Sequence, residues 1–208
     1  MFYKSTYYEK GEGFMKKRVF GIFLCLTLAI GMLATTASAG SVFPDVSDDA
    51  DYAWAAELTQ GMGIFTGDEN GNFNPDQGIT RAQCAAVVCR LLDAETDAQS
   101  MSTTVFTDVP TSHWANGYIA WAYEQGIISG YGNGKFGPSD TVTYEQAIKM
   151  LMAGIGYNDA AIDAGGYPNG YISVADNYGF LRGVEDTLGD VITRSNIAVL
   201  VSNIIVIR

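Results

Sequence analysis

Histidine and cysteine are nearly absent from this chain of 208 residues, which has one histidine and three cysteines. The histidine, His113, precedes Trp114 and has no serine or cysteine at a spacing typical of a catalytic motif, so we interpret it as a residue at a helix start. Cys84 and Cys89 fall on one predicted helix, where neither a disulfide nor a set of metal ligands forms easily. We interpret both as small apolar core residues. The sequence therefore predicts no catalytic residue, no metal site and no cofactor.

Basic residues are also scarce. The chain has 12 Lys and Arg against 23 Asp and Glu, a formal net charge of −11. Five of the 12 lie before residue 19, so the rest of the chain is more acidic still. We therefore expect neither nucleic acid nor an anionic membrane surface as a partner. The paired carboxylates of a glycoside hydrolase remain an alternative in so acidic a chain, although no spacing singles out a pair.

Long apolar runs are confined to the N-terminus. The positively charged residues MKKR at 15–18 come before an apolar run at 19–34, and the tripeptide ASA follows just before Gly40. This order predicts a secretory signal peptide over residues 1–39, with Met15 as the expected translation start. A retained membrane anchor is the alternative, but the run is shorter than the roughly 18 residues that a spanning helix needs. We expect a secreted protein with no stable membrane insertion after cleavage.

Internal repetition is the strongest pattern in the sequence. FPDV at 43–46 recurs as FTDV at 106–109, and GIFTG at 63–67 recurs as GIISG at 126–130. A third, degenerate copy follows and lacks the Phe-x-Pro element of the first two. The predicted repeats span residues 40–103, 104–158 and 159–208.

Each predicted repeat consists of a helix, a glycine-punctuated loop and a second helix. Thr80, Thr143 and Thr193 each precede an apolar run and predict the start of the second helix. In the first repeat Gln83 completes a capping box. One such hairpin cannot bury its apolar stripe alone, whereas three can bury theirs against one another. The predicted fold is therefore mainly α, with three helix-loop-helix repeats.

These motifs, in this order, resemble surface-layer homology repeats. The resemblance is carried by FPDV and GIFTGDENGNFNPDQGITRAQ in the first copy and by FTDV and GIISGYGNGKFGPSDTVTYEQ in the second, and it covers nearly all of the chain after residue 39. It implies a pseudo-threefold bundle with one helix of each repeat at the centre and grooves between neighbouring repeats. It also implies non-covalent binding to secondary cell-wall polysaccharide, often pyruvylated, on the surface of a Gram-positive-type bacterium.

The resemblance gives a role to Arg81, which follows the cap Thr80. A cation at a helix N-terminus opposes the helix dipole, so Arg81 needs another explanation. Together with unpaired backbone N–H groups it would bind a pyruvate carboxylate. Arg194 has the matching position in the third repeat, while Tyr144 replaces the arginine in the second and could stack on a sugar. The alternative is that both arginines point into water and only the threonines matter.

Five further residues complete the predicted polysaccharide-binding set: Gln83, Gln146, Asp45, Asp108 and Trp114. The two aspartates could instead anchor the start of each first helix. Trp114, like Trp54, could instead be a packing residue. The leading hypothesis is a wall-anchoring module that is not an enzyme. An assembly or adaptor protein that contacts other surface-layer proteins comes second, and a wall-active hydrolase third.

Overall fold

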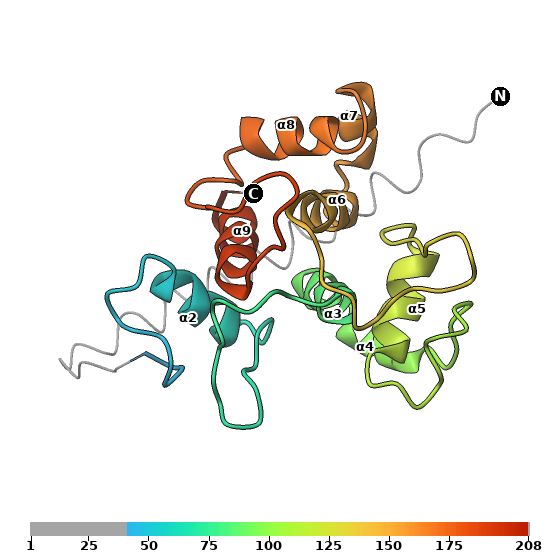
Figure 1. Cartoon of the computed structure of the whole chain (residues 1–208), viewed down its shortest axis with the longest axis horizontal. Helices are drawn as coiled ribbons and strands as arrows, with labels where there is room; N and C mark the ends of the chain where they lie inside the picture. Colours follow the sequence, from blue (N-terminus) through green and yellow to red (C-terminus); the bar gives the residue numbers. More distant parts are fainter. Residues whose placement is uncertain (1–40, 208) are drawn as a thin grey trace. The chain divides into compact units, whose positions relative to one another are not determined.

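The computed structural model describes residues 41–207 (Figure 1), so the predicted signal peptide lies outside the described residues. Within that range the chain forms eight helices and isolated β-bridges but no strand, which confirms the mainly α prediction. The helices are α2 (Ala53–Gly61), α3 (Arg81–Leu91), α4 (Glu95–Ser100), α5 (Asn116–Glu124), α6 (Tyr144–Gly154), α7 (Asn158–Asp163), α8 (Asn169–Asn177) and α9 (Arg194–Ile207). None of the helices in residues 41–207 is long and apolar enough to cross a membrane.

Helices α3, α6 and α9 each begin directly after one of the three predicted cap threonines. The Thr80 Oγ1 atom accepts from the Gln83 N–H at 3.2 Å, and Gln83 Oε1 accepts from the Thr80 N–H at 2.9 Å. This is the predicted capping box. At α9 the Thr193 N–H instead donates to Asp186 at 2.8 Å, so an acidic residue from the preceding loop replaces the glutamine. The predicted starts of the three second helices are confirmed.

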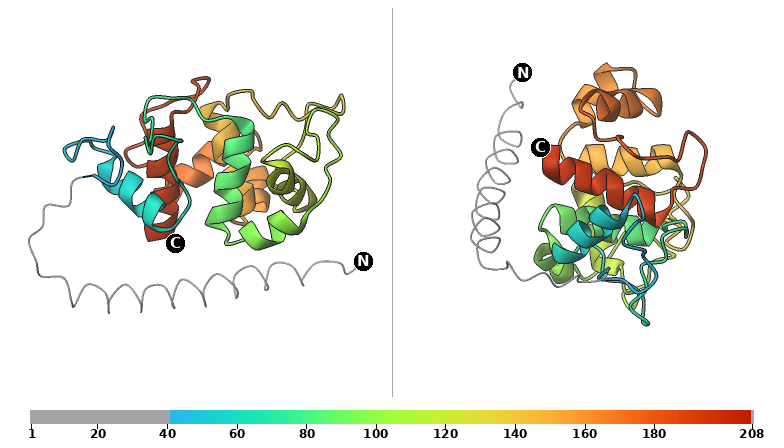
Figure 2. Two further views of the ribbon diagram at one scale, coloured as in Figure 1. Left: turned by 90° about the horizontal axis from the view of Figure 1, so that it is seen from below. Right: turned by 90° about the vertical axis from the view of Figure 1, so that its left-hand side faces the viewer.

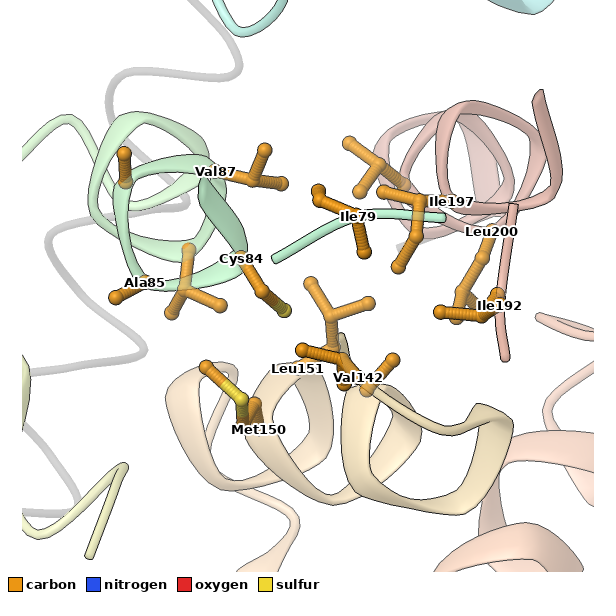
Figure 3. Packing of buried hydrophobic residues seen from close by; sticks show 14 of the residues in the cluster. Ile79, Cys84, Ala85, Val87, Val142, Met150, Leu151, Ile192, Ile197 and Leu200 are labelled. Carbon is orange, nitrogen blue, oxygen red and sulfur yellow. The ribbon is translucent and has the colours of Figure 1, made fainter. Parts of the chain in front are cut away.

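A closed ring of backbone hydrogen bonds joins the three residues that precede the caps. The Ile79 N–H donates to the Ile192 carbonyl at 3.2 Å, that of Ile192 to Val142 at 3.0 Å, and that of Val142 back to Ile79 at 3.0 Å. All three side chains are fully buried. Figure 3 shows them at the centre of the core, where α3, α6 and α9 converge. The ring gives the described part of the chain its pseudo-threefold centre.

Each shorter first helix packs against the second helix of another repeat. Helix α5 lies on α3, α8 lies on α6, and α2 lies on α9 (Figures 1 and 2). The last pairing closes the cycle, because it joins the final helix to the first described one. Helices α4 and α7 cover α5 and α8 respectively. Residues from all parts of the described chain therefore contribute to one core.

The two cysteines of α3 are part of this core. The side chains of Cys84 and Cys89 are both fully buried and unpaired. Burial raises the pKa of each thiol to about 12, because the thiolate would lose its hydration. The prediction that they are small apolar core residues is confirmed.

Candidate functional site

Arg81 extends from the start of α3 onto the loop of the second predicted repeat. Its Nε atom donates to the Phe136 carbonyl at 2.8 Å, and its Nη2 atom donates to the Ser129 carbonyl at 2.9 Å. The guanidinium carbon lies 4.5 Å from the centre of the Phe136 ring and 4.9 Å from that of Tyr131. Such contacts add cation–π attraction to the two hydrogen bonds. Only 8% of Arg81 is exposed, so the alternative that it points into water is wrong.

Arg194 makes the corresponding contact between α9 and the first loop. Its Nε atom donates to the Phe73 carbonyl at 2.6 Å, and its guanidinium lies over the rings of Phe65 and Phe73 at 5.0 and 5.3 Å. Burial lowers the pKa of Arg194, and the negative charges of Asp45 and Asp68 partly offset this effect. Arg194 is half-buried, and among residues 41–207 its guanidinium hydrogen bonds use Nε alone. Arg81, by contrast, also uses an outer nitrogen, Nη2, for a loop carbonyl.

Tyr144 has the same position at the start of α6. Its backbone N–H donates to the Asp190 carbonyl at 2.9 Å, and only 8% of the residue is exposed. Burial raises the pKa of its phenol, and the charges of Asp176 and Asp186 raise it further. The hydroxyl therefore stays neutral at ordinary pH and can donate a hydrogen bond. The substitution of tyrosine for arginine leaves this position without a cation.

The first backbone N–H groups of α3 and α9 are not free to bind an anion. At α3, Arg81, Ala82 and Gln83 donate to the Asp140 carbonyl, the Pro138 carbonyl and Thr80 Oγ1. At α9, Arg194, Ser195 and Asn196 donate to the Gln77 carbonyl, the Pro75 carbonyl and Thr193 Oγ1. The expectation of unpaired amides beside each arginine is therefore wrong. Carbonyl oxygens of a neighbouring loop satisfy these helix termini instead.

Asp45 and Asp108 hold the two long loops rather than the helix starts. Asp45 accepts from the N–H groups of Phe73 and Asn74 at 2.7 and 2.6 Å. Asp108 accepts from those of Phe136 and Gly137, each at 2.8 Å. Each carboxylate thus fixes the loop segment whose carbonyl receives an arginine. The alternative that these aspartates anchor the start of each first helix is therefore wrong, because the element that they hold is the loop.

Gln83 and Gln146 use their side-chain oxygens for capping. Gln146 Oε1 accepts from the Thr143 N–H at 3.3 Å, as Gln83 does from Thr80. Both glutamines are half-buried. A contact of either residue with a sugar stays a prediction, and it would use the amide nitrogen.

Trp114 lies apart from the arginines. With 58% of its surface exposed, it lines a hollow of about 280 Å³ between α4 and the start of α5, and neither arginine lines that hollow. We call this the Trp114 hollow. Trp54 is also 45% exposed, so neither tryptophan is a fully buried core residue, and a sugar contact of either one stays a prediction. Helix α5 begins at Asn116, two residues after Trp114.

A second hollow of about 340 Å³ lies between residues of the first and third predicted repeats. Its walls carry Tyr52 and the four carboxylates of Asp51, Asp76, Glu185 and Asp186. We call this the Tyr52 hollow. Burial raises the pKa of Tyr52, and the charges of Asp76 and Asp45 raise it further. The hydroxyl therefore remains a neutral donor. The carboxylates repel anions, and sugar hydroxyls are better suited to this surface.

Some of these residues could not be recognised from the sequence. Tyr131 covers Arg81, and Tyr52 lines a hollow, yet each appears in the sequence only as one aromatic among many. The offset between the first two copies places Tyr131 opposite Asp68, so the repeat pattern itself gives no signal for an aromatic there.

His113 accepts from the Ala115 N–H through Nδ1 at 3.1 Å, which agrees with its interpretation as a residue at a helix start.

The fold and its repeated contacts define a helical repeat protein whose units are joined in a ring. Residues 42–85 and 105–148 each match the S-layer homology domain. The chain is an S-layer homology domain protein. The family match falls within the first two predicted repeats, and the boundaries of all three repeats stay predictions.

Several of the similar proteins are named for the cell surface or the cell wall. A "Cell surface protein" of Thermoanaerobacter kivui is 36% identical over 175 residues, which are 83% of this chain and 22% of the relative. A "Middle cell wall protein" of Brevibacillus brevis (strain 47) is 29% identical over 181 residues, 86% of this chain and 17% of the relative. The chain thus spans about a fifth of the length of these curated relatives. The predicted location at the cell surface is confirmed.

An enzyme is also among the similar proteins. An "Endoglucanase" of Bacillus sp. (strain KSM-635) is 29% identical over 150 residues, 68% of this chain and 15% of that protein. The shared region therefore occurs both in surface-layer proteins and in a longer protein named for a catalytic activity.

Proposed function

We propose that this chain is a non-covalent anchoring module that binds secondary cell-wall polysaccharide. The observation that carries the proposal is the S-layer homology match together with the position of Arg194, a half-buried arginine at the contact between two repeats. Relatives named as cell surface and cell wall proteins support it. In this proposal the module has no catalytic role. It consists of three repeats with the boundaries given above.

The acidic substituent of the polysaccharide, a pyruvate group in this proposal, binds at Arg194. The guanidinium is fixed on one edge by the Phe73 carbonyl and stacks on two aromatic rings, so its orientation is set before the ligand arrives. A preorganised guanidinium loses little freedom when it pairs with a carboxylate. The nearby Tyr52 hollow receives neutral hydroxyl groups of the same polysaccharide, because the carboxylates of the hollow accept hydrogen bonds.

Arg81 and Tyr144 contribute less to the ligand's acidic group. Arg81 already uses two nitrogens for loop carbonyls and is nearly buried, whereas Tyr144 has no charge. We propose that both, with the amide groups of Gln83 and Gln146, contact neutral parts of the polysaccharide. Asp45 and Asp108 then act by holding the loops that carry Phe73 and Phe136.

Titration calorimetry with purified wall polysaccharide tests the role of Arg194. Arg194→Gln should weaken binding about tenfold or more, since a hydrogen bond to a charged group contributes roughly 1.5–3 kcal/mol. Lys135→Gln is the matched control, because it removes an exposed cation from a loop. In the same titrations with depyruvylated polysaccharide, the native protein and Arg194→Gln should bind with equal affinity. Equal affinity of all variants for both forms would refute the anion site, and tight self-association without polysaccharide binding would favour an assembly protein.

A further inference from the structure

We propose that the Trp114 hollow is a second carbohydrate site, separate from the arginine positions and selective for an uncharged sugar. The main observation is the exposure of Trp114, which is 58% accessible although it borders a formed hollow of about 280 Å³. Small-ligand sites typically combine an aromatic surface with a few oriented polar groups, at volumes from about 300 Å³ upward. The hollow is slightly smaller than that range, which suits one or two sugar rings better than a folded partner.

Trp114 is held firmly enough to act as a stacking surface. The His113 ring stacks beside it at 5.9 Å with an interplanar angle of 28°, and the Tyr118 ring packs at 6.2 Å. Tyr118 is itself fixed, because its hydroxyl donates to Glu95 and accepts from Arg90. An indole supported in this way presents a flat apolar face without a large entropic cost on binding.

The polar groups around the hollow are uncharged. Gln99, Ser102 and Thr111 line it with amide and hydroxyl groups, and no Asp, Glu, Lys or Arg is among the described residues that line it. His113 Nδ1 accepts from the Ala115 N–H, so Nε2 is the ring nitrogen left for a ligand. In an acidic chain, a hollow with hydroxyl and amide groups and no charge matches a neutral ligand rich in hydroxyls.

The hollow is formed by the close approach of α4 to α5. A Cβ atom on Gly117 would lie 2.1 Å from the Ala98 carbonyl oxygen, so the two elements meet at a position where only glycine fits. Asn116 further fixes the start of α5, because its amide donates to the carbonyls of Val109 and Pro110 at 3.4 and 3.2 Å. The walls are thus set by helix packing and do not need a ligand to form.

The proposal is tested by following the indole N–H signals of Trp54, Trp114 and Trp121 by nuclear magnetic resonance. The probes are methyl N-acetyl-β-glucosaminide and oligosaccharides of the wall polysaccharide from which the acidic groups have been removed. The Trp114 signal should shift saturably, while that of Trp54, an exposed tryptophan elsewhere, should stay unchanged. Trp114→Ala should weaken binding of the neutral oligosaccharide about tenfold or more, since aromatic anchors dominate such contacts. Trp54→Ala should not.

One result separates this site from the arginine positions, and two results would overturn the proposal. Arg194→Gln should retain native affinity for the neutral oligosaccharide, so the Trp114 site can be correct even where the proposed anion site fails. The proposal is overturned if neither probe moves the Trp114 signal at millimolar concentrations. It is equally overturned if Trp114→Ala binds the neutral oligosaccharide as tightly as the native protein while its circular dichroism spectrum is unchanged.

Discussion

The Nε atom of Arg81 donates a hydrogen bond to the carbonyl oxygen of Phe136 at 2.8 Å and so joins α3 to the loop of the next predicted repeat. This contact resolves the electrostatic conflict of a cation at a helix N-terminus. The dipole penalty is a few tenths of a kcal/mol, whereas a hydrogen bond from a charged donor contributes roughly 1.5–3 kcal/mol. Arg81 therefore stabilises the contact between repeats at the expense of its own helix.

Arg81→Ala should lower the free energy of unfolding by about 1.5–3 kcal/mol, because the carbonyls of Ser129 and Phe136 lose their partner. Urea denaturation followed by circular dichroism measures the loss. Lys135→Ala removes an exposed cation and should change the free energy by less than about 0.5 kcal/mol. If the two variants were equally stable, the inter-repeat role of Arg81 would be wrong.

The general architecture could be predicted because it follows from local patterns. Thr80 with Gln83 marks a helix start, and the repeat offset predicts a shared core. The role of Arg81 could not be predicted in this way, because its partners lie in a different repeat. A capping motif shows where a helix begins but gives no direction for a long side chain.

The same limit applies to the aspartates and to Trp114. Asp45 and Asp108 lie far in sequence from the loop amides that they bind, so spacing could not assign those partners. The exposure of Trp114 depends on how α4 packs against α5, and the spacing of residues in the sequence does not specify that packing. The candidate residues were visible in the sequence, but their grouping into an arginine contact and a separate hollow required the structure.

Gly117→Ala should destabilise the protein by about 1–3 kcal/mol, since the added methyl group would lie 2.1 Å from the Ala98 carbonyl oxygen. Thermal unfolding of this variant should be compared with that of Gly61→Ala. Gly61 is in α2 and has nothing within 4 Å of an added Cβ, so its replacement should be neutral or slightly stabilising. A Gly117→Ala melting temperature equal to that of Gly61→Ala would show that the α4–α5 contact is looser than described.

The carboxylate of Asp108 should make the free energy of unfolding depend on pH. Burial alone would raise its pKa, but the N–H groups of Phe136 and Gly137 outweigh burial and hold the pKa below its ordinary value of 3.8. This stabilisation is present above about pH 4 and is lost as the pH falls through the lowered folded-state pKa. The difference in unfolding free energy between the native protein and Asp108→Asn should therefore shrink below pH 4. A constant difference from pH 7 to pH 2 would contradict the assigned hydrogen bonds.

The buried thiols should report on the cooperativity of the core. Because burial raises the pKa of Cys84 and Cys89 to about 12, almost no thiolate exists in the native state at pH 8. Ellman's reagent should react slowly with the chain that begins at Gly40 until urea unfolds it, and both thiols should then react in one transition. Rapid reaction of one thiol in native buffer would mean that α3 opens locally.

Anchoring to the wall is tested most directly by sedimentation of the chain that begins at Gly40 with purified cell walls. Walls that keep their secondary polysaccharide should retain the protein, whereas walls from which that polysaccharide has been extracted should not. Added free polysaccharide should release the bound protein without any covalent link being broken. Equal retention by extracted and intact walls, or no release by free polysaccharide, would contradict polysaccharide binding as the basis of anchoring.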